Sequence, residues 1–430
     1  MQTRNRNRRH GLIATLPLAL LLAACGAGAS PSSPSRSTPT PTPVPTLIPT
    51  PSVPATTPTP SATVVANPLA VVGSENAGIG PYTLGLVNAQ GIVVAAVTAN
   101  TPSDYYSGGD PAITSTSDSR LYYEDGNTNI DYLTSTGQHG VAFTVSRPSG
   151  AVVVFAVSPD DSRVAVAVLT NFNADAPPYT SHMYLMAMGG GIQQTLFDGT
   201  STSSTAPLTW PVGWDGGNLV VAQSVPAYFS GYGPGTGPCS SGSDCASQLR
   251  VFNLANKALG PPLCAADTGA MTGAPTAAGI ACGAGFEAGA NTPALAAVSW
   301  SGVVTSFGSS SPGYTSSQDP WGGSCMLSPH GAVIACASDT LDDGTIPAKA
   351  FRAGGVVQKI PNPLDFQLLG WLDGNDVVVA TGGSIAMGGT FGGLAVENIV
   401  SGKRIPVSLA KSPAPYSDQW QFLGVIPGAL

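Results

Sequence analysis

The stretch FAVSPDDSRVAVAVL, residues 155–169, places a short polar segment between two apolar runs. The flanking residues are small or β-branched, which is typical of short buried strands. Between them, Pro159 fixes φ at the second position of a tight turn, and Asp160 and Asp161 suit the positions that follow. The stretch therefore predicts a β-hairpin.

Hairpins of related form recur along the chain. CMLSPHGAVIACA (325–337) repeats the Ser-Pro turn, whereas VGWDGGNLVVA (212–222) and LGWLDGNDVVVA (369–380) have a tryptophan in its place. ITSTSDSRLYY (113–123) is a weaker copy. Hairpins of a second type, with a Gly- or Asn-containing turn, alternate with these and occupy seven stretches, 84–97, 132–145, 184–197, 249–263, 294–307, 350–360 and 394–409.

One hairpin of each type supplies four strands, which is one blade of a β-propeller. The second-type hairpins begin about 45 to 65 residues apart, a period that fits a blade with its loops. The sequence thus predicts an all-β fold of seven four-stranded blades, with six or eight blades and a pair of β-sandwiches as alternatives. WQFLGVIPG (420–428) is predicted to pair with the hairpin at 84–97 and so close the ring.

The Ser-Pro turns carry a family resemblance. Ser158–Asp161 and Ser328–Gly331, each followed by a β-branched run, resemble the WD40-like repeats of TolB-type propellers. The Gly-His and Trp-Asp signature of eukaryotic WD40 repeats is absent from the sequence. The resemblance implies a propeller fold of a kind that often serves binding rather than catalysis.

The beginning of the chain has the layout of an export signal. Four arginines within the first ten residues precede an apolar stretch, 11–22, that is too short to span a membrane. The following LAAC, ending at Cys25, resembles the lipobox of bacterial lipoproteins. That resemblance implies that residues 1–24 are removed and that Cys25 receives a diacylglyceryl anchor, which holds a protein durably. Cleavage without lipidation is the alternative.

Residues 25–67 are dominated by Pro, Ser and Thr, which predicts a disordered tether. An extended polyproline-type spacer of this length reaches about 100 Å or more. The predicted organisation is a signal peptide at 1–24, a lipidated tether at 25–67 and a propeller at 68–430. This places the folded domain at the cell envelope, outside the cytoplasm and anchored by lipid to a membrane.

Charge excludes one class of partner. Only 9% of the residues are charged, with 16 basic and 24 acidic side chains. Removal of residues 1–24 takes away four of the basic residues and no acidic ones, which leaves a formal charge of −12. An acidic surface without basic clusters is a poor partner for nucleic acid. The chain also has no phosphate-binding loop or dinucleotide fingerprint, and we predict no cofactor.

Six cysteines remain after Cys25, and an even number in an exported protein predicts disulfides. We predict that Cys239 pairs with Cys245 across the short loop CSSGSDC. The pairing of the other four is not assigned, and these are Cys264, Cys282, Cys325 and Cys336. Metal ligation is the alternative, but no CxxC pair or neighbouring histidine supports it.

Catalytic and metal-binding motifs are weak. No Gly-x-Ser-x-Gly elbow accompanies the three histidines beyond the leader, His139, His182 and His330. His139 and His330 fall in or beside short turns, whereas His182 is predicted to precede a strand. Residues 125–131 alternate Asp and Asn as calcium loops do, but lack the required glycine and glutamate, so a polar turn is favoured. Residues 342–344, Asp-Asp-Gly, are likewise interpreted as a turn.

Aromatic residues are the best candidates for binding. Trp214, Trp371 and Trp420 occupy equivalent positions on first strands and are predicted to pack between blades. Large aromatics among Gly, Ser and Asn are typical of contact surfaces, although they can also fold back over their own loops. The predicted ligand-binding residues are Tyr105, Tyr106, Tyr179, Tyr228, Phe229, Tyr232, Tyr314 and Trp321.

The order of loops in a blade predicts where these aromatics gather. Turns that join strands one to two and three to four leave one face of a propeller, and in this chain they are short. The long loops with the aromatics join strands two to three, or one blade to the next, and leave the other face. We predict a monomeric binding or scaffolding module for a protein, peptide or glycan. A cell-surface lyase or hydrolase and a purely structural envelope protein are the alternatives.

Overall fold

The computed structural model describes the greater part of the chain beyond residue 67. The described residues are 68–74, 81–102, 114–170, 178–191, 193–202, 208–224, 248–264, 270–271, 275–283, 295–308, 324–337, 349–354, 356–360, 366–381, 393–408 and 420–426. The predicted signal peptide and tether lie outside these ranges. Within them, no helix has the length and hydropathy needed to cross a membrane.

The described residues form seven four-stranded antiparallel sheets, which we number as blades in chain order and give from the innermost strand outward. Blade 1 is β28 (Trp420–Ile426), β1 (Leu69–Ser74), β2 (Tyr82–Val87) and β3 (Val93–Ala99). Blade 2 is β4 (Thr114–Thr116), β5 (Arg120–Asp125), β6 (Asn129–Thr134) and β7 (His139–Thr144). Blade 3 is β8 (Val152–Val157), β9 (Arg163–Thr170), β10 (Tyr179–Ala187) and β11 (Gln194–Ser201).

The remaining blades follow in chain order. Blade 4 is β12 (Leu208–Asp215), β13 (Asn218–Ser224), β14 (Gln248–Asn253) and β15 (Ala258–Leu259). Blade 5 is β16 (Ala270–Met271), β17 (Ile280–Gly283), β18 (Ala296–Val298) and β19 (Val304–Ser306). Blade 6 is β20 (Ser324–Leu327), β21 (Val333–Ala337), β22 (Lys349–Arg352) and β23 (Val356–Lys359). Blade 7 is β24 (Phe366–Trp371), β25 (Asp376–Thr381), β26 (Gly393–Asn398) and β27 (Arg404–Pro406).

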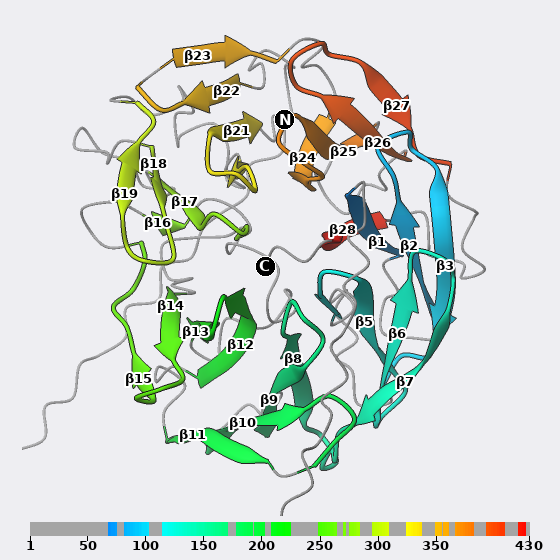
Figure 1. Ribbon diagram of the computed structural model, residues 1–430, viewed down its shortest axis with the longest axis vertical. Coiled ribbons are helices and arrows are strands. Elements are labelled where there is room, and N and C mark those ends of the chain that lie inside the picture. The colour runs from blue at the N-terminus through cyan, green and yellow to red at the C-terminus, as the bar shows by residue number, and fades with distance from the viewer. Residues whose placement is uncertain are drawn as a thin grey trace, which may run out of the picture. The chain divides into compact units, whose positions relative to one another are not determined.

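Each blade meets its two neighbours, which closes the sheets into a ring (Figure 1). The inner strands β28, β4, β8 and β12 contact one another in that order, and β17, β20, β24 and β28 complete the circuit. Blades 4 and 5 share one cluster of buried side chains. The fold is therefore a seven-bladed β-propeller, as the hairpin count predicts, and the alternatives of six blades, eight blades or paired sandwiches are wrong.

Closure of the ring differs in one detail from the prediction. The C-terminal β28 pairs with β1, from Leu69 opposite Ile426 to Ser74 opposite Trp420, and β1 in turn pairs with β2. The shared blade is confirmed, but β1 lies between the closing strand and the hairpin at 84–97. The sequence around residues 69–74 does not indicate this pairing, because the inner partner of β1 lies at the other end of the chain.

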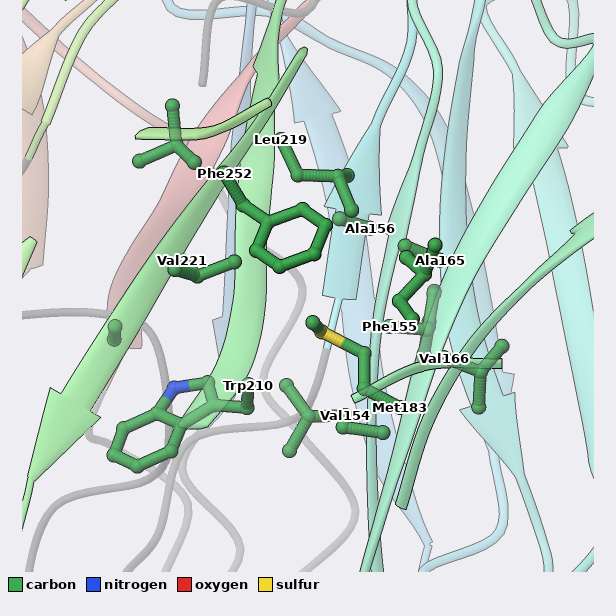
Figure 2. Close-up of a cluster of buried hydrophobic side chains, with 14 of the residues drawn as sticks. Val154, Phe155, Ala156, Ala165, Val166, Met183, Trp210, Leu219, Val221 and Phe252 are labelled. Carbon is green, nitrogen blue, oxygen red and sulfur yellow. The ribbon is translucent and has the colours of Figure 1, made fainter. Parts of the chain in front are cut away.

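The core consists of apolar side chains packed between adjacent blades. Blades 3 and 4 illustrate it: Val154 and Met183 meet Trp210, Val221 and Phe252 in one cluster (Figure 2). Successive side chains of a strand point to opposite faces, so a strand inside the ring needs apolar residues at nearly every position. This explains runs such as VVVFAV in β8, which is buried throughout.

Two tryptophans tie neighbouring blades together, as predicted. Trp214 of blade 4 donates from Nε1 to the carbonyl of Ala156 in blade 3 at 3.0 Å. Trp371 of blade 7 donates in the same way to the carbonyl of Met326 in blade 6, also at 3.0 Å. In both cases the accepting residue lies two positions before the serine of a Ser-Pro turn. The hairpins with tryptophan thus bond to the hairpins with the Ser-Pro turn in the preceding blade. The side chain of Trp420 lies outside the described residues.

Two disulfides lie in the described part of the chain. Cys264–Cys282 joins the segment after β15 in blade 4 to β17 in blade 5, with the Cα atoms 5.7 Å apart. Cys325–Cys336 joins β20 to β21, where the two residues are directly opposite in register. The sequence left both pairings unassigned. Cys239 and Cys245 lie outside the described residues, so their pairing stays a prediction.

The two faces of the ring differ in the length of their connections. On one face, which we call the short-turn face, connections join strands one to two and three to four of a blade, and the longest covers residues 272–279. On the opposite, long-connection face, strands two and three and successive blades are joined. Its longest connections cover residues 100–113, 225–247, 307–323 and 407–419. The loop order predicted from the sequence is confirmed.

Candidate functional site

The predicted contact residues belong to the long-connection face by chain order. Tyr105 and Tyr106 fall between β3 and β4, Tyr228, Phe229 and Tyr232 between β13 and β14, and Tyr314 and Trp321 between β19 and β20. All seven lie outside the described residues, as do Cys25 and Asp342–Gly344. A binding role for these aromatics stays a prediction.

Tyr179 requires a correction. The sequence places it in a loop, but it is the first residue of β10, and only 3% of its surface is exposed. It alternates with Ser181 and Met183 along the buried face of the strand, in the cluster shared by blades 3 and 4. A side chain on that face supports the core and is not offered to a partner.

The contact between blades 2 and 3 carries polar side chains at both of its ends. At its short-turn end lies Asp161, the residue that follows Pro159 and Asp160 in the hairpin turn. Its Oδ1 accepts a hydrogen bond from the hydroxyl of Tyr122, and its Oδ2 accepts one from Ser119, both at 2.7 Å. Asp161 therefore links the turn of blade 3 to β5 and its preceding turn in blade 2.

The backbone of Asp161 explains why a side-chain network forms at this turn. Its φ is 57°, a left-handed conformation that costs free energy for a residue with a Cβ. The equivalent residue in the Ser-Pro turn of blade 6 is Gly331, with φ of 71°. Hydrogen bonds from the neighbouring blade offset the cost at Asp161. Asp118 lies in the adjoining turn, and its pKa is raised above the ordinary value, first by its own burial and then by the negative charge of Asp161.

At the long-connection end of the same contact lies a buried ion pair. Glu124 is on β5 near its end, and Arg147 is in the segment between β7 and β8. Their nearest charged atoms, Oε1 of Glu124 and Nη1 of Arg147, are 3.6 Å apart, and their side chains are 4% and 2% exposed. The Nε of Arg147 donates to the carbonyl of Ala151 at 2.6 Å. The carboxyl group of Glu124 and the guanidinium group of Arg147 are thus enclosed where blades 2 and 3 meet.

This pair is incompletely satisfied. Oε2 of Glu124 and both terminal nitrogens of Arg147 make no hydrogen bond within the described residues. Burial raises the pKa of Glu124 from 4.5 to about 8, and the nearby positive charge of Arg147 only partly opposes that rise. Desolvation therefore outweighs the attraction to Arg147 and favours the protonated form of Glu124.

A second acid–base pair lies further out on blade 3. His182 on β10 faces Asp198 on β11, and Nδ1 of the imidazole is hydrogen-bonded to Oδ1 of the carboxylate. Their side chains are 45% and 68% exposed, and the ring of Tyr184 lies 5.4 Å from the imidazole. The sequence predicts that His182 precedes a strand, but the structure places it within β10. The carboxylate fixes the orientation of the imidazole, as in general-base pairs, but no serine hydroxyl contacts His182 in the described part of the chain.

The other polar candidates have structural roles. His139 and His330 are exposed, at the start of β7 and in the Ser-Pro turn respectively. The segment 125–131 comprises the last residue of β5, a turn at 126–128 and the start of β6. Asp125 accepts hydrogen bonds from the backbone and side-chain nitrogens of Asn100 at 2.7 Å. Over the described ranges, no three His, Cys, Asp or Glu side chains are grouped as a metal site requires.

Comparison with known proteins gives distant likenesses of fold. No protein-family model and no curated protein matches the sequence. An acylaminoacyl peptidase in complex with Z-Gly-Gly-Phe-chloromethyl ketone is 11% identical with a TM-score of 0.44, over 80% of this chain and 51% of the peptidase. This chain thus spans about half the length of that protein.

Two further structures are similar at the same level. An oligogalacturonate lyase in complex with manganese is 10% identical with a TM-score of 0.34, over 79% of this chain and 77% of the lyase. The WD40 domain of SCAP from fission yeast is 7% identical with a TM-score of 0.35, over 84% of this chain and 94% of that domain. At such values no activity or partner is transferred to this chain.

Proposed function

We propose that this chain is a lipid-anchored, extracytoplasmic β-propeller that binds a protein, peptide or glycan of the cell envelope at its long-connection face. The observation that carries the proposal is the difference between the two faces. Every connection on the short-turn face is brief, whereas the other face receives the long segments in which the sequence concentrates Tyr, Phe and Trp. Long loops over a rigid ring are the usual place for recognition.

The binding proposal is tested by substitution on both faces. We expect Tyr228→Ala and Trp321→Ala each to weaken capture of envelope proteins or cell-wall glycans about tenfold or more, because Tyr and Trp dominate interface energies. The matched control is Gln90→Ala in the short-turn connection of blade 1, which should leave capture unchanged. Pull-down from an envelope extract measures the effect, and an unchanged melting temperature shows that the fold is intact. Equal losses for the control and the two aromatic variants would contradict the proposal.

The anchor is a separate expectation. Cys25→Ser removes the thiol that would carry the lipid, and we expect the protein to leave the membrane fraction. Fractionation followed by a carbonate wash measures this, with the parent chain as the reference. A Cys25→Ser protein that stays with the washed membranes would rule out lipid attachment at this residue as the anchor.

An enzymatic role of the lyase or hydrolase class is the second candidate. The observation in its favour is the exposed His182–Asp198 pair, in which a carboxylate orients an imidazole. A hydrolytic or eliminating activity lost in His182→Ala and retained in His139→Ala would favour it over the binding role.

A further inference from the structure

The outermost strand of blade 1, β3, has one edge that faces away from the ring. β3 is the outermost strand of its blade (Figure 1) and pairs with β2 on its inner side only. Beyond a β-bulge at Val94, alternate amide and carbonyl groups of Ala95–Ala99 face outward. No hydrogen bond to those outward groups is found among the described residues. The side chains at 94, 96 and 98 are exposed, with Val94 at 40%. With respect to the described residues, the strand therefore presents an unpaired hydrogen-bonding edge together with apolar surface.

The other described outer strands are protected against edge pairing. β15, β19, β23 and β27 have only two to four residues each. β11 is longer but carries Asp198, and Lys257 of blade 4 donates from Nζ to the carbonyl of Thr195 within it. β7 begins with His139. β3 has seven residues, five of them after its bulge at Val94, and no charged side chain, histidine or proline. Because an unguarded edge recruits another strand, such edges in native proteins are usually covered.

Charge points to what covers this edge. The chain has a formal charge of −8, so two copies repel each other over most approaches. Blade 1 is different, because its described residues, 69–74, 81–102 and 420–426, include no Asp, Glu, Lys, Arg or His. Blade 5 is also uncharged over its described residues, but its outer strand has only three residues. A second copy can approach blade 1 without direct charge repulsion and find a strand long enough to pair.

We propose that β3 pairs antiparallel with β3 of a second copy, so that the two four-stranded blades form one continuous sheet across a twofold axis. Antiparallel pairing of identical strands is symmetric, so each copy offers the groups that the other needs. Centred on Ala96, the register places Ala95 opposite Val97, and the bulge at Val94 lies opposite Thr98 at each end. Small and β-branched uncharged residues then face one another throughout, a favourable cross-strand set. This assembly departs from the monomer expected from the sequence and does not depend on the proposed binding face.

Cross-linking tests the register directly. In the chain from Gly26 onward, Ala96→Cys places two thiols across the axis at a Cα separation of about 4.5–5.5 Å, within the range for a disulfide. We expect a covalent dimer under mild oxidation. Val304→Cys is the matched control, because Val304 is equally apolar, 52% exposed and on the short outer strand of blade 5. Equal dimer yields from the two variants, or none from Ala96→Cys, would overturn the proposal.

Sedimentation of the uncrosslinked protein provides the second readout. The parent chain from Gly26 onward should show a concentration-dependent dimer, and Ala96→Lys should raise its dissociation constant at least tenfold, because a central lysine opposes itself across the axis. Val304→Lys should leave the dimer unchanged. Circular dichroism confirms that each variant is folded. A parent chain that stays monomeric at 200 μM, or a dimer that survives Ala96→Lys, would refute strand pairing between two copies. Binding of an unrelated extended peptide to a monomer would refute a second copy as the occupant of the edge.

Discussion

Removal of residues 420–430 is expected to unfold the entire propeller. β28 is the innermost strand of blade 1, where it pairs along the whole length of β1 and contacts the inner strands β24 and β4 of both flanking blades. Val425 and Ile426 are buried. The deletion therefore exposes two apolar seams and the inner edge of β1 together. We expect the loss to exceed about 5 kcal/mol, comparable to the whole stability of many domains.

Urea unfolding followed by circular dichroism measures the effect of this deletion. The matched control is a chain that ends at Ile426, which keeps β28 and should unfold like the parent. Gly370→Ala provides a point substitution in the same seam, since an added Cβ would lie 2.1 Å from the ring of Phe422. It should destabilise the ring with every blade melting in one transition. A deletion variant with the parent's midpoint would show that β28 does not close the structure.

The second large effect concerns Glu124 and pH. Its pKa is 4.5 in an unfolded chain and about 8 in the folded protein, because burial disfavours the carboxylate. Between these values the folded state binds one more proton than the unfolded state, so the free energy of unfolding falls as pH rises from about 5 to 8. The fall is at most about 1.4 kcal/mol per pH unit. The parent should therefore lose a few kcal/mol over this range.

Glu124→Gln should remove this part of the pH dependence, because the amide stays neutral. Asp198→Asn, at a carboxylate that is 68% exposed, is the matched control and should keep the parent's slope. Arg147→Ala should keep the fall in stability steep up to pH 8, because the positive charge of Arg147 lowers the pKa of Glu124 and its removal lets that pKa rise further. Urea midpoints at pH 5, 6.5 and 8 give these values. Parallel pH profiles for the parent and Glu124→Gln would show that Glu124 does not titrate as inferred.

Local turn chemistry explains how much of the fold was predictable. Ser158-Pro159 and the Asn88–Gly91 turn specify hairpins from adjacent residues alone, so the number of blades and the order of short and long connections follow from the sequence. β1 was missed because its inward partner, β28, is remote in the chain. The pairing of Cys264 with Cys282 depends on which blades are neighbours, and that is fixed only when the ring closes.

The polar contacts between blades were harder to predict for a similar reason. Asp161 was recognised as a turn residue, but its partners, Ser119 and Tyr122, come from the preceding blade. Glu124 had a usable signal, because in the strand LYYED it lies on the same side as the buried Tyr122. Its partner, Arg147, has no such signal in the sequence. Tyr179 was misassigned to a loop because its burial is decided by its alternation with Ser181 and Met183 along β10.

The position of β1 determines how the ring responds to mechanical load. Any pull transmitted through the chain before Pro68 enters the propeller at Leu69, on a strand held on both sides by β28 and β2. A force along this strand shears both ladders at once, whereas an outer strand such as β3 would peel away one hydrogen bond at a time. If the preceding segment is a tether, the attachment point is therefore among the parts of the ring most resistant to tension, and stretching should leave the loops of the long-connection face in place.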